Sequence, residues 1–189
     1  MEAPATSAQP SLTEPASTEP SAAPTVALVV TATEAPQAVP ADWQTYVDTV
    51  YDYELHYPLG WAVQGTPSQG MGGVARLEGE HAGEMLYMDL GKHFSPLQTG
   101  ESLREYEVRR TEGGGMEPPE VVSEAPVQLG ERDAYRQTIR LRAGSGDKEY
   151  GIYYLFAGGP DVYFAEAYVV DPEAHLPLIE QILGTIQFQ

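Results

Sequence analysis

The positions of apolar side chains predict a chain built mostly from short strands. Between residues 53 and 57 apolar and polar side chains alternate, and a period of two is typical of a half-buried strand. Trp61 begins a returning strand after the Pro-Leu-Gly turn that follows. Residues 74–77 and 85–90 are expected to form a hairpin, with residues 78–84 as its turn. The first half of the folded part is therefore expected to consist of hairpins.

The second half has the same texture, with tight glycine turns between the strands. Residues 121–129, 149–157 and 162–170 are rich in aromatic and β-branched side chains, which favour strands. Residues 135–142 alternate between apolar and polar side chains, broken only by Gln137. Turns are expected at residues 143–147 and 158–161. Successive strands joined by short turns predict an antiparallel meander.

A first helix is predicted over residues 102–112. Ser102 and Glu105 form a capping box, in which the hydroxyl and the carboxylate each satisfy a backbone amide of the first turn. Leu103 and Tyr106 lie on one face of this helix. The three glycines that begin at Gly113 have too much backbone freedom to continue it.

The chain ends in a second helix. Asp171 is an N-cap followed by a proline in the first turn, but Pro177 is expected to interrupt the helix, so that its main part begins there and Gly184 caps it. A short strand is expected at residues 185–188. Helices between sets of hairpin strands predict an α+β fold, with a mostly antiparallel sheet and helices packed on it.

Composition divides the 189-residue chain into two parts. Residues 1–42 are nearly all Ala, Pro, Ser, Thr and Glu, and such a stretch has too little bulky apolar surface to fold. We therefore interpret residues 1–42 as a disordered linker and residues 43–189 as one α+β domain. A proline-rich spacer commonly tethers a folded module to a membrane or cell wall, although it can also be a tail without that role.

Charge and cysteine content exclude several classes of function. The net charge is −18, so the chain should be repelled by nucleic acid and by anionic membrane surfaces. The absence of cysteine rules out disulfides, thiolate metal sites and cysteine nucleophiles. No apolar run approaches the length of a membrane span, and no basic region precedes the run at residues 26–30. Attachment to a membrane would therefore need an upstream anchor that this sequence does not contain.

No pattern in the chain indicates catalysis, a metal or a cofactor. Serine nucleophile motifs and the zinc-protease motif are missing. The four histidines, His56, His81, His93 and His175, are far apart in sequence, and we expect them to be solvated rather than to converge on zinc. Acidic residues are so common that close carboxylate pairs carry little information. We therefore predict no catalytic residue, no metal ligand and no cofactor.

The most distinctive charged feature is Arg136, Arg140 and Arg142, which share one face of a predicted strand. They can pair across strands with acidic neighbours such as Glu149 and Glu166, or they can form a docking surface for an acidic partner. Five tyrosines on the next strands can line a groove, although aromatic side chains this dense are more often core. They are Tyr150, Tyr153, Tyr154, Tyr163 and Tyr168.

Three segments resemble PsbP-like domains. The sequence YELHYPLGW at residues 53–61 is similar to their opening strand, Tyr-Pro and x-Gly-Trp, although Tyr53-Glu54 stands where Gly-Phe is usual. The SLREY helix start at residues 102–106 and the closing helix that runs into GTIQF at residues 184–188 resemble the same family. The resemblance covers residues 43–189 and implies an α/β/α sandwich around a mostly antiparallel sheet. It also implies an exported, lipoprotein-like bacterial protein, and it carries no catalytic residue.

These observations favour a non-catalytic extracytoplasmic binding or assembly module, tethered to the cell envelope by the flexible spacer. We expect a monomer that binds an unidentified protein partner, with Arg136, Arg140 and Arg142 as the candidate binding residues. The alternative is a small-ligand or divalent-cation binding protein, which the acidic composition and the tyrosine-rich strands suggest. An enzyme that uses an unrecognised carboxylate pair is a third possibility.

Overall fold

The computed structural model describes residues 38–65, 73–113, 119–142 and 148–189. All of them belong to one compact unit, Thr33–Gln189. Most of the expected linker, residues 1–37, and the expected turn at residues 143–147 lie outside the described residues. The division at residue 42 therefore stays a prediction.

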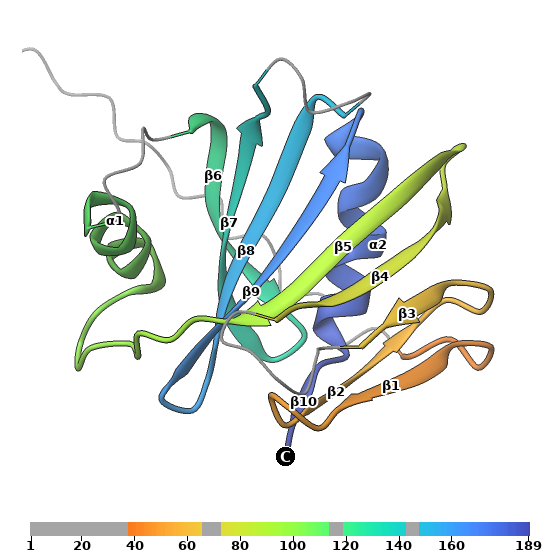
Figure 1. Cartoon of the computed structure of the whole chain (residues 1–189), viewed down its shortest axis with the longest axis horizontal. Coiled ribbons are helices and arrows are strands. Elements are labelled where there is room, and N and C mark those ends of the chain that lie inside the picture. Colours follow the sequence, from red (N-terminus) through yellow and green to blue (C-terminus); the bar gives the residue numbers. More distant parts are fainter. Residues whose placement is uncertain (1–37, 66–72, 114–118, 143–147) are drawn as a thin grey trace, which may run out of the picture. The chain divides into compact units, whose positions relative to one another are not determined.

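The strands of the described residues form two antiparallel sheets (Figure 1). The large sheet has the order β3-β4-β5-β9-β8-β7-β6, and the small sheet has the order β1-β2-β10. The large sheet contains β3 (Ala62–Gln64), β4 (Ala75–His81), β5 (Glu84–Lys92), β6 (Glu120–Leu129), β7 (Arg132–Arg140), β8 (Tyr150–Gly158) and β9 (Asp161–Val169). The small sheet contains β1 (Gln44–Asp48), β2 (Tyr53–Tyr57) and β10 (Gln187–Phe188). The adjacent strands β6 to β9 confirm the predicted meander.

Two helices cover opposite faces of the large sheet. Side chains alternate along β8, so that Tyr154 and Phe156 join the core beneath α2 (Pro172–Gly184), while Leu155 packs with Tyr106 of α1 (Leu103–Gly113). The small sheet contributes to the α2 side. In Figure 1 strands β5 and β9 pass in front of α2, and α1 lies beside β6 and β7. The fold is thus α+β, with helices on both sides of an antiparallel sheet. Neither helix is long and apolar enough to cross a membrane.

Both predicted helix starts are confirmed. The Ser102 hydroxyl accepts the Glu105 N–H at 3.2 Å, and a Glu105 carboxylate oxygen accepts the Ser102 N–H at 2.8 Å. The Asp171 carboxylate accepts the Glu173 N–H at 3.1 Å. Each bond satisfies an amide that the first turn leaves without a helical partner.

The predicted turn at residues 78–84 is wrong, because both strands of that hairpin are longer. Strand β4 continues to His81, and the turn contains only Ala82 and Gly83, which have φ angles of 51° and 82°. These angles suit the two-residue turns that match the twist of a hairpin. The glutamates that suggested a turn, Glu78 and Glu80, occupy the exposed positions of the strand.

The return strand predicted after Trp61 does not pair with β2. Strand β3 pairs with β4 in the large sheet, whereas β2 pairs with β1, which the sequence pattern missed. The Trp61 ring lies against Gly79, where a Cβ atom would come within 2.2 Å of the ring. The absence of a side chain at Gly79 therefore makes room for the tryptophan on the sheet.

The predicted break at Pro177 is also wrong, because α2 is continuous through it. A proline there leaves the Glu173 carbonyl without its helical hydrogen bond. Both residues are exposed, so water can satisfy that carbonyl. The C-cap is Thr185 rather than Gly184, and the Thr185 N–H bonds the Ile182 carbonyl at 3.1 Å.

Candidate functional site

The predicted arginine surface is largely occupied by contacts within the chain. Arg136 bonds Glu180 of α2 at 2.7 Å, and its side chain is only 22% exposed. The Tyr154 hydroxyl donates to the same Glu180 oxygen at 3.2 Å. Arg140 lies 3.4 Å from Glu120 of β6, while Arg142 follows the end of β7 and also has an interaction. Arg136 is therefore an internal link between β7 and α2.

The acidic partners of these arginines differ from those suggested by the sequence. Glu180 and Glu120 take the place of Glu149 and Glu166. Glu166 cannot pair with Arg136, because Glu166 lies on the α1 side of the sheet and Arg136 on the α2 side. Docking of an acidic partner by Arg136, Arg140 and Arg142 stays a prediction.

The expectation of solvated histidines is wrong for His175, which is 1% exposed in α2. Its Nε2 bonds Glu84, and its Nδ1 lies 3.0 Å from Nδ1 of His81. The second oxygen of Glu84 accepts a hydrogen bond from Lys148 at 2.6 Å. This histidine cluster, composed of His81, Glu84, Lys148 and His175, joins the β4–β5 turn to α2 and to the segment before β8.

The hydrogen bonds of the histidine cluster explain how a buried imidazole is tolerated. With Nε2 donating to Glu84, Nδ1 of His175 is left to accept a hydrogen bond from Nδ1 of His81. Burial alone would raise the pKa of Glu84, but hydrogen bonds from Lys148, the Val170 backbone and His175 lower it. Burial and the neighbouring His175 lower the pKa of His81. Among the described residues, no three His, Asp or Glu side chains are arranged to hold a metal ion.

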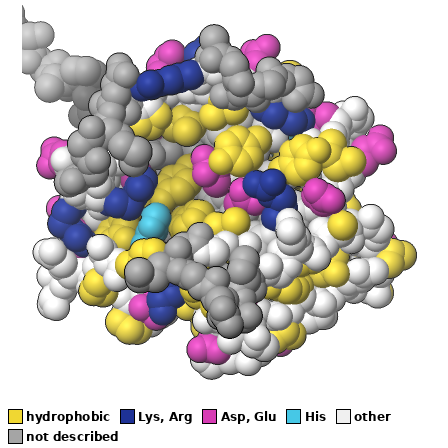
Figure 2. Space-filling view, viewed as in Figure 1, with side chains coloured by type: hydrophobic (Ala, Val, Ile, Leu, Met, Phe, Trp, Pro, Cys, Tyr) yellow, Lys and Arg dark blue, Asp and Glu magenta, His cyan; other side chains and the backbone are white. Residues whose placement is uncertain are grey.

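A different surface lies on the α1 side of the large sheet, where α1 packs mainly over β7 and β8. Strands β4, β5 and β9, which are not the strands that α1 mainly contacts, carry four half-buried side chains and the buried Asp89 there. We call these side chains the open face: Arg76, Tyr87, Asp89, Glu166 and Tyr168. Figure 2 looks onto this side of the molecule and shows hydrophobic, acidic and basic side chains next to one another across its middle.

Strand register brings the members of the open face together. Asp89 of β5 lies opposite Arg76 of β4 on one side and Glu166 of β9 on the other. In the next row Tyr87 lies opposite Tyr168. Directly opposite residues have Cβ atoms about 4.5–5.5 Å apart, so the two carboxylates and the two rings are immediate neighbours.

The two carboxylates of the open face have different surroundings. Asp89 accepts two hydrogen bonds from Arg76, each 2.6 Å long. No ion pair among the described residues includes Glu166. Burial raises the pKa of Glu166 and the charge of Asp89 adds to this, while the Tyr168 hydroxyl and the charge of Arg110 oppose it. Glu166 therefore bears its charge in a place that disfavours it.

A polar contact with α1 borders the open face. Arg110 bonds Glu107 at 2.7 and 2.8 Å and lies over the Tyr153 ring at 5.6 Å. The Tyr153 hydroxyl lies 2.7 Å from Nε2 of His93. Burial and the charge of Arg110 lower the pKa of His93 to about 4, so this imidazole is neutral near pH 7.

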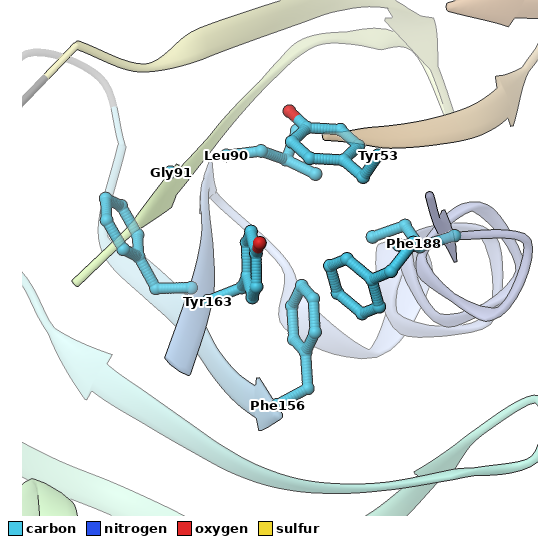
Figure 3. A pocket seen from close by; sticks show the side chains of 8 residues that line it. Tyr53, Leu90, Gly91, Phe156, Tyr163 and Phe188 are labelled. Carbon is cyan, nitrogen blue, oxygen red and sulfur yellow. The ribbon is translucent and has the colours of Figure 1, made fainter. Parts of the chain in front are cut away.

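An aromatic crevice lies on the opposite side of the large sheet, next to the small sheet (Figure 3). Its rings include Phe156, Tyr163 and Phe188, and the centroids of the last two are 4.5 Å apart. The crevice encloses about 160 Å³, including space open to solvent, and has no charged lining residue. Small-ligand sites are typically about 300–1,000 Å³, so this crevice does not support ligand binding.

Sequence reasoning missed the open face and the histidine cluster for the same reason. Tyr87 and Asp89, like Glu166 and Tyr168, stand two residues apart within strands, which predicts a shared face for each pair. The sequence does not show that β5 and β9 are neighbours, because their contact joins segments far apart in the chain. The only available signal was the presence of acidic residues within otherwise apolar strands.

No protein-family model and no curated protein matches this sequence. The fold is similar to the solution structure of cyanobacterial PsbP (CyanoP) from Synechocystis sp. PCC 6803. That match has a TM-score of 0.49 and 13% identity, and covers 80% of this chain and 95% of that one. A crystal structure from Bacteroides thetaiotaomicron has a TM-score of 0.49 and 11% identity, and covers 78% of this chain and 49% of that one. No residue role is taken from either structure.

Proposed function

We propose that this protein is a non-catalytic binding module and that a protein partner docks on the open face. The carrying observation is that Tyr87, Tyr168 and Glu166 are held by a regular sheet on strands outside the main contacts of α1, and that they stay partly exposed. Tyrosine rings supply large contact area at a small entropic cost, and aromatic side chains are enriched in protein interfaces. The strands hold these groups in fixed positions, which favours binding without a large rearrangement.

The effect of Glu166 on the stability of the fold supports this proposal. A carboxylate with a raised pKa opposes folding at neutral pH, and such groups gather at functional sites more often than elsewhere. A glutamine would fill the same space in the sheet without the charge. The retained charge is therefore better explained by binding than by packing.

The proposed setting is extracytoplasmic, with residues 1–42 as a flexible spacer between the domain and the cell envelope. The composition of those residues and the absence of cysteine are compatible with that setting. Protease added to intact cells should digest the protein, while a cytoplasmic control protein survives. Equal protection of both proteins would contradict the proposed location.

Site-specific photo-crosslinking in the native cell tests the docking surface. A photoreactive amino acid at Tyr87 should give a discrete adduct that disappears when Tyr168→Ala is added. Two control positions are Thr45, exposed on β1, and Glu149, whose carbonyl accepts the Leu141 N–H beside the arginines. An adduct from Glu149 but not from Tyr87 would move the function to the arginine surface. No adduct from either position would contradict the proposed function.

A further inference from the structure

Three carboxylates on the α1 side of the sheet are paired with arginines, whereas the half-buried Glu166 is not. Asp89 is paired with Arg76, Glu107 with Arg110, and Glu124 with Arg104 at 2.8 Å. Glu166 lies within the same transverse row, between Asp89 and Tyr153. The Tyr168 hydroxyl and, at longer range, the charge of Arg110 act on its carboxylate. The neighbours of Glu166 thus have direct ion pairs with arginines, whereas no ion pair among the described residues includes Glu166.

The nearest arginines are already engaged. Arg76 uses both Nε and Nη2 on Asp89, and Arg110 uses both of the same atoms on Glu107. Each two-bond ion pair holds its guanidinium on another carboxylate, and no ion pair among the described residues joins either arginine to Glu166. Asp89 and Glu166 are directly opposite, and like charges in that position destabilise a sheet. A cation from outside the chain would relieve this repulsion.

The rings beside Glu166 suit a cationic side chain. Tyr87 and Tyr168 are half-buried neighbours in the adjacent row of the same face. On the α1 half of that face, the Arg110 guanidinium already stacks over Tyr153 while Glu107 binds it. The open half also combines rings with a carboxylate, but its arginine, Arg76, binds Asp89, and no ion pair among the described residues includes Glu166. Rings and carboxylates together favour lysine or arginine side chains.

We propose that the partner of this module inserts a lysine or arginine side chain beside Tyr87 and Tyr168 and pairs it with Glu166. This inference rests on the proposed function and names the chemistry of its partner. The net charge of −18 would attract a basic protein segment over a longer range. A second copy of this chain is the less suitable occupant, because it carries the same charge and would be repelled.

Binding of a defined peptide tests this proposal on the full chain. The probe is a tetra-arginine peptide, and a tetra-citrulline peptide of the same shape is its uncharged control. The protein variants are Glu166→Gln and Glu131→Gln, which change the net charge equally, with Glu131 exposed in the β6–β7 turn. Thermal unfolding of each variant confirms that it is folded. Titrations at low and at moderate salt separate a local ion pair with Glu166 from attraction by the net charge of the protein, because salt screens long-range attraction between exposed charges more strongly.

We expect the arginine peptide to bind the parent protein and Glu131→Gln equally, and Glu166→Gln at least tenfold more weakly. The citrulline peptide should bind none of them measurably. Equal binding of both variants would overturn the proposal and assign the affinity to overall charge. Binding of Ca²⁺ or Mn²⁺ that depends on Glu166, without peptide binding, would overturn it in favour of a metal. If the Tyr87 adduct persists while the peptide does not bind, the docking function stands and the cationic partner does not.

Discussion

The two sides of the large sheet are packed by different chemistry. On the α2 side Ile179, Ile182 and Leu183 are fully buried against the sheet and against β2. On the α1 side Tyr106 is the one fully buried side chain of the helix. Its buried neighbour Glu107 and the half-buried Arg110 form an ion pair facing the strands.

This difference in packing means that the α2 side mainly stabilises the fold, while the α1 side is free to serve binding. Burial of an aliphatic side chain contributes roughly 1.5–3 kcal/mol, so the α2 side supplies most of the driving force for folding. The polar α1 interface contributes less, because a buried ion pair must first offset the loss of its hydration. The α1 side can therefore keep the half-buried Glu166 carboxylate and two half-buried tyrosines without unfolding the domain.

The largest expected effect tests the α2 side. Ile182→Ala should lower the free energy of unfolding by about 2–5 kcal/mol, because it leaves a cavity in the core. The matched change on the other helix is Val108→Ala, at a side chain that is 42% exposed. It should cost less than about 0.5 kcal/mol. Urea unfolding measures both, and equal losses would remove the contrast between the two helices.

Two arginines on the α2 side should differ in their contribution to stability, because Arg136 is more buried than Arg140. Arg136→Ala should cost about 1–3 kcal/mol, because it leaves the Glu180 carboxylate without its charged hydrogen-bond partner. Arg140→Ala removes an exposed pair and should cost at most about 1 kcal/mol. Denaturant midpoints for the two variants provide the comparison. A larger cost at Arg140 would show that Arg136 does not link β7 to α2.

His93 gives the α1 side a pH dependence of known sign. Its folded pKa, about 4, lies below the ordinary 6.5, so the unfolded chain takes up the proton first as the pH falls. Its contribution is therefore present above pH 6.5 and is lost between pH 6.5 and about 4. The shift sets an upper limit of roughly 3 kcal/mol, and because the ring is partly exposed we expect about 1–2 kcal/mol.

The measurement is the stability of the parent protein minus that of His93→Gln across this pH range. His56→Gln, on β2, is the control for the loss of an imidazole elsewhere. The difference should shrink toward acid for His93→Gln. A flat difference for that variant would show that the His93 imidazole is not held neutral by its surroundings.

Local patterns predicted the elements better than their partners. The period of two around Tyr53 and the capping box at Ser102 depend on neighbouring residues, and both predictions are confirmed. The predicted helix break at Pro177 was wrong because the free-energy cost of a proline inside a helix depends on whether the freed carbonyl, here that of Glu173, reaches water. That exposure is set by how α2 docks, which no local pattern contains.

The candidate sites were out of reach for a related reason. His81 and His175 are 94 residues apart in the chain and meet only because the β4–β5 turn reaches the start of α2. Asp89 and Glu166 meet only through the pairing of β5 with β9. The three arginines could be found in the sequence because they lie within one predicted strand. Their surroundings could not be predicted, and Arg136 faces α2 rather than solvent.

The smallest and most informative effect is expected at Glu166. Because its folded pKa is raised above the ordinary 4.5, its contribution to stability is present below pH 4.5 and is lost as the pH rises through the folded value. Glu166→Gln should therefore raise the free energy of unfolding at pH 7 relative to Glu131→Gln, and this gain should vanish below pH 4.5. A Glu166→Gln protein that is less stable at pH 7 would show that the carboxylate serves the fold, and would contradict an α1 side kept for binding.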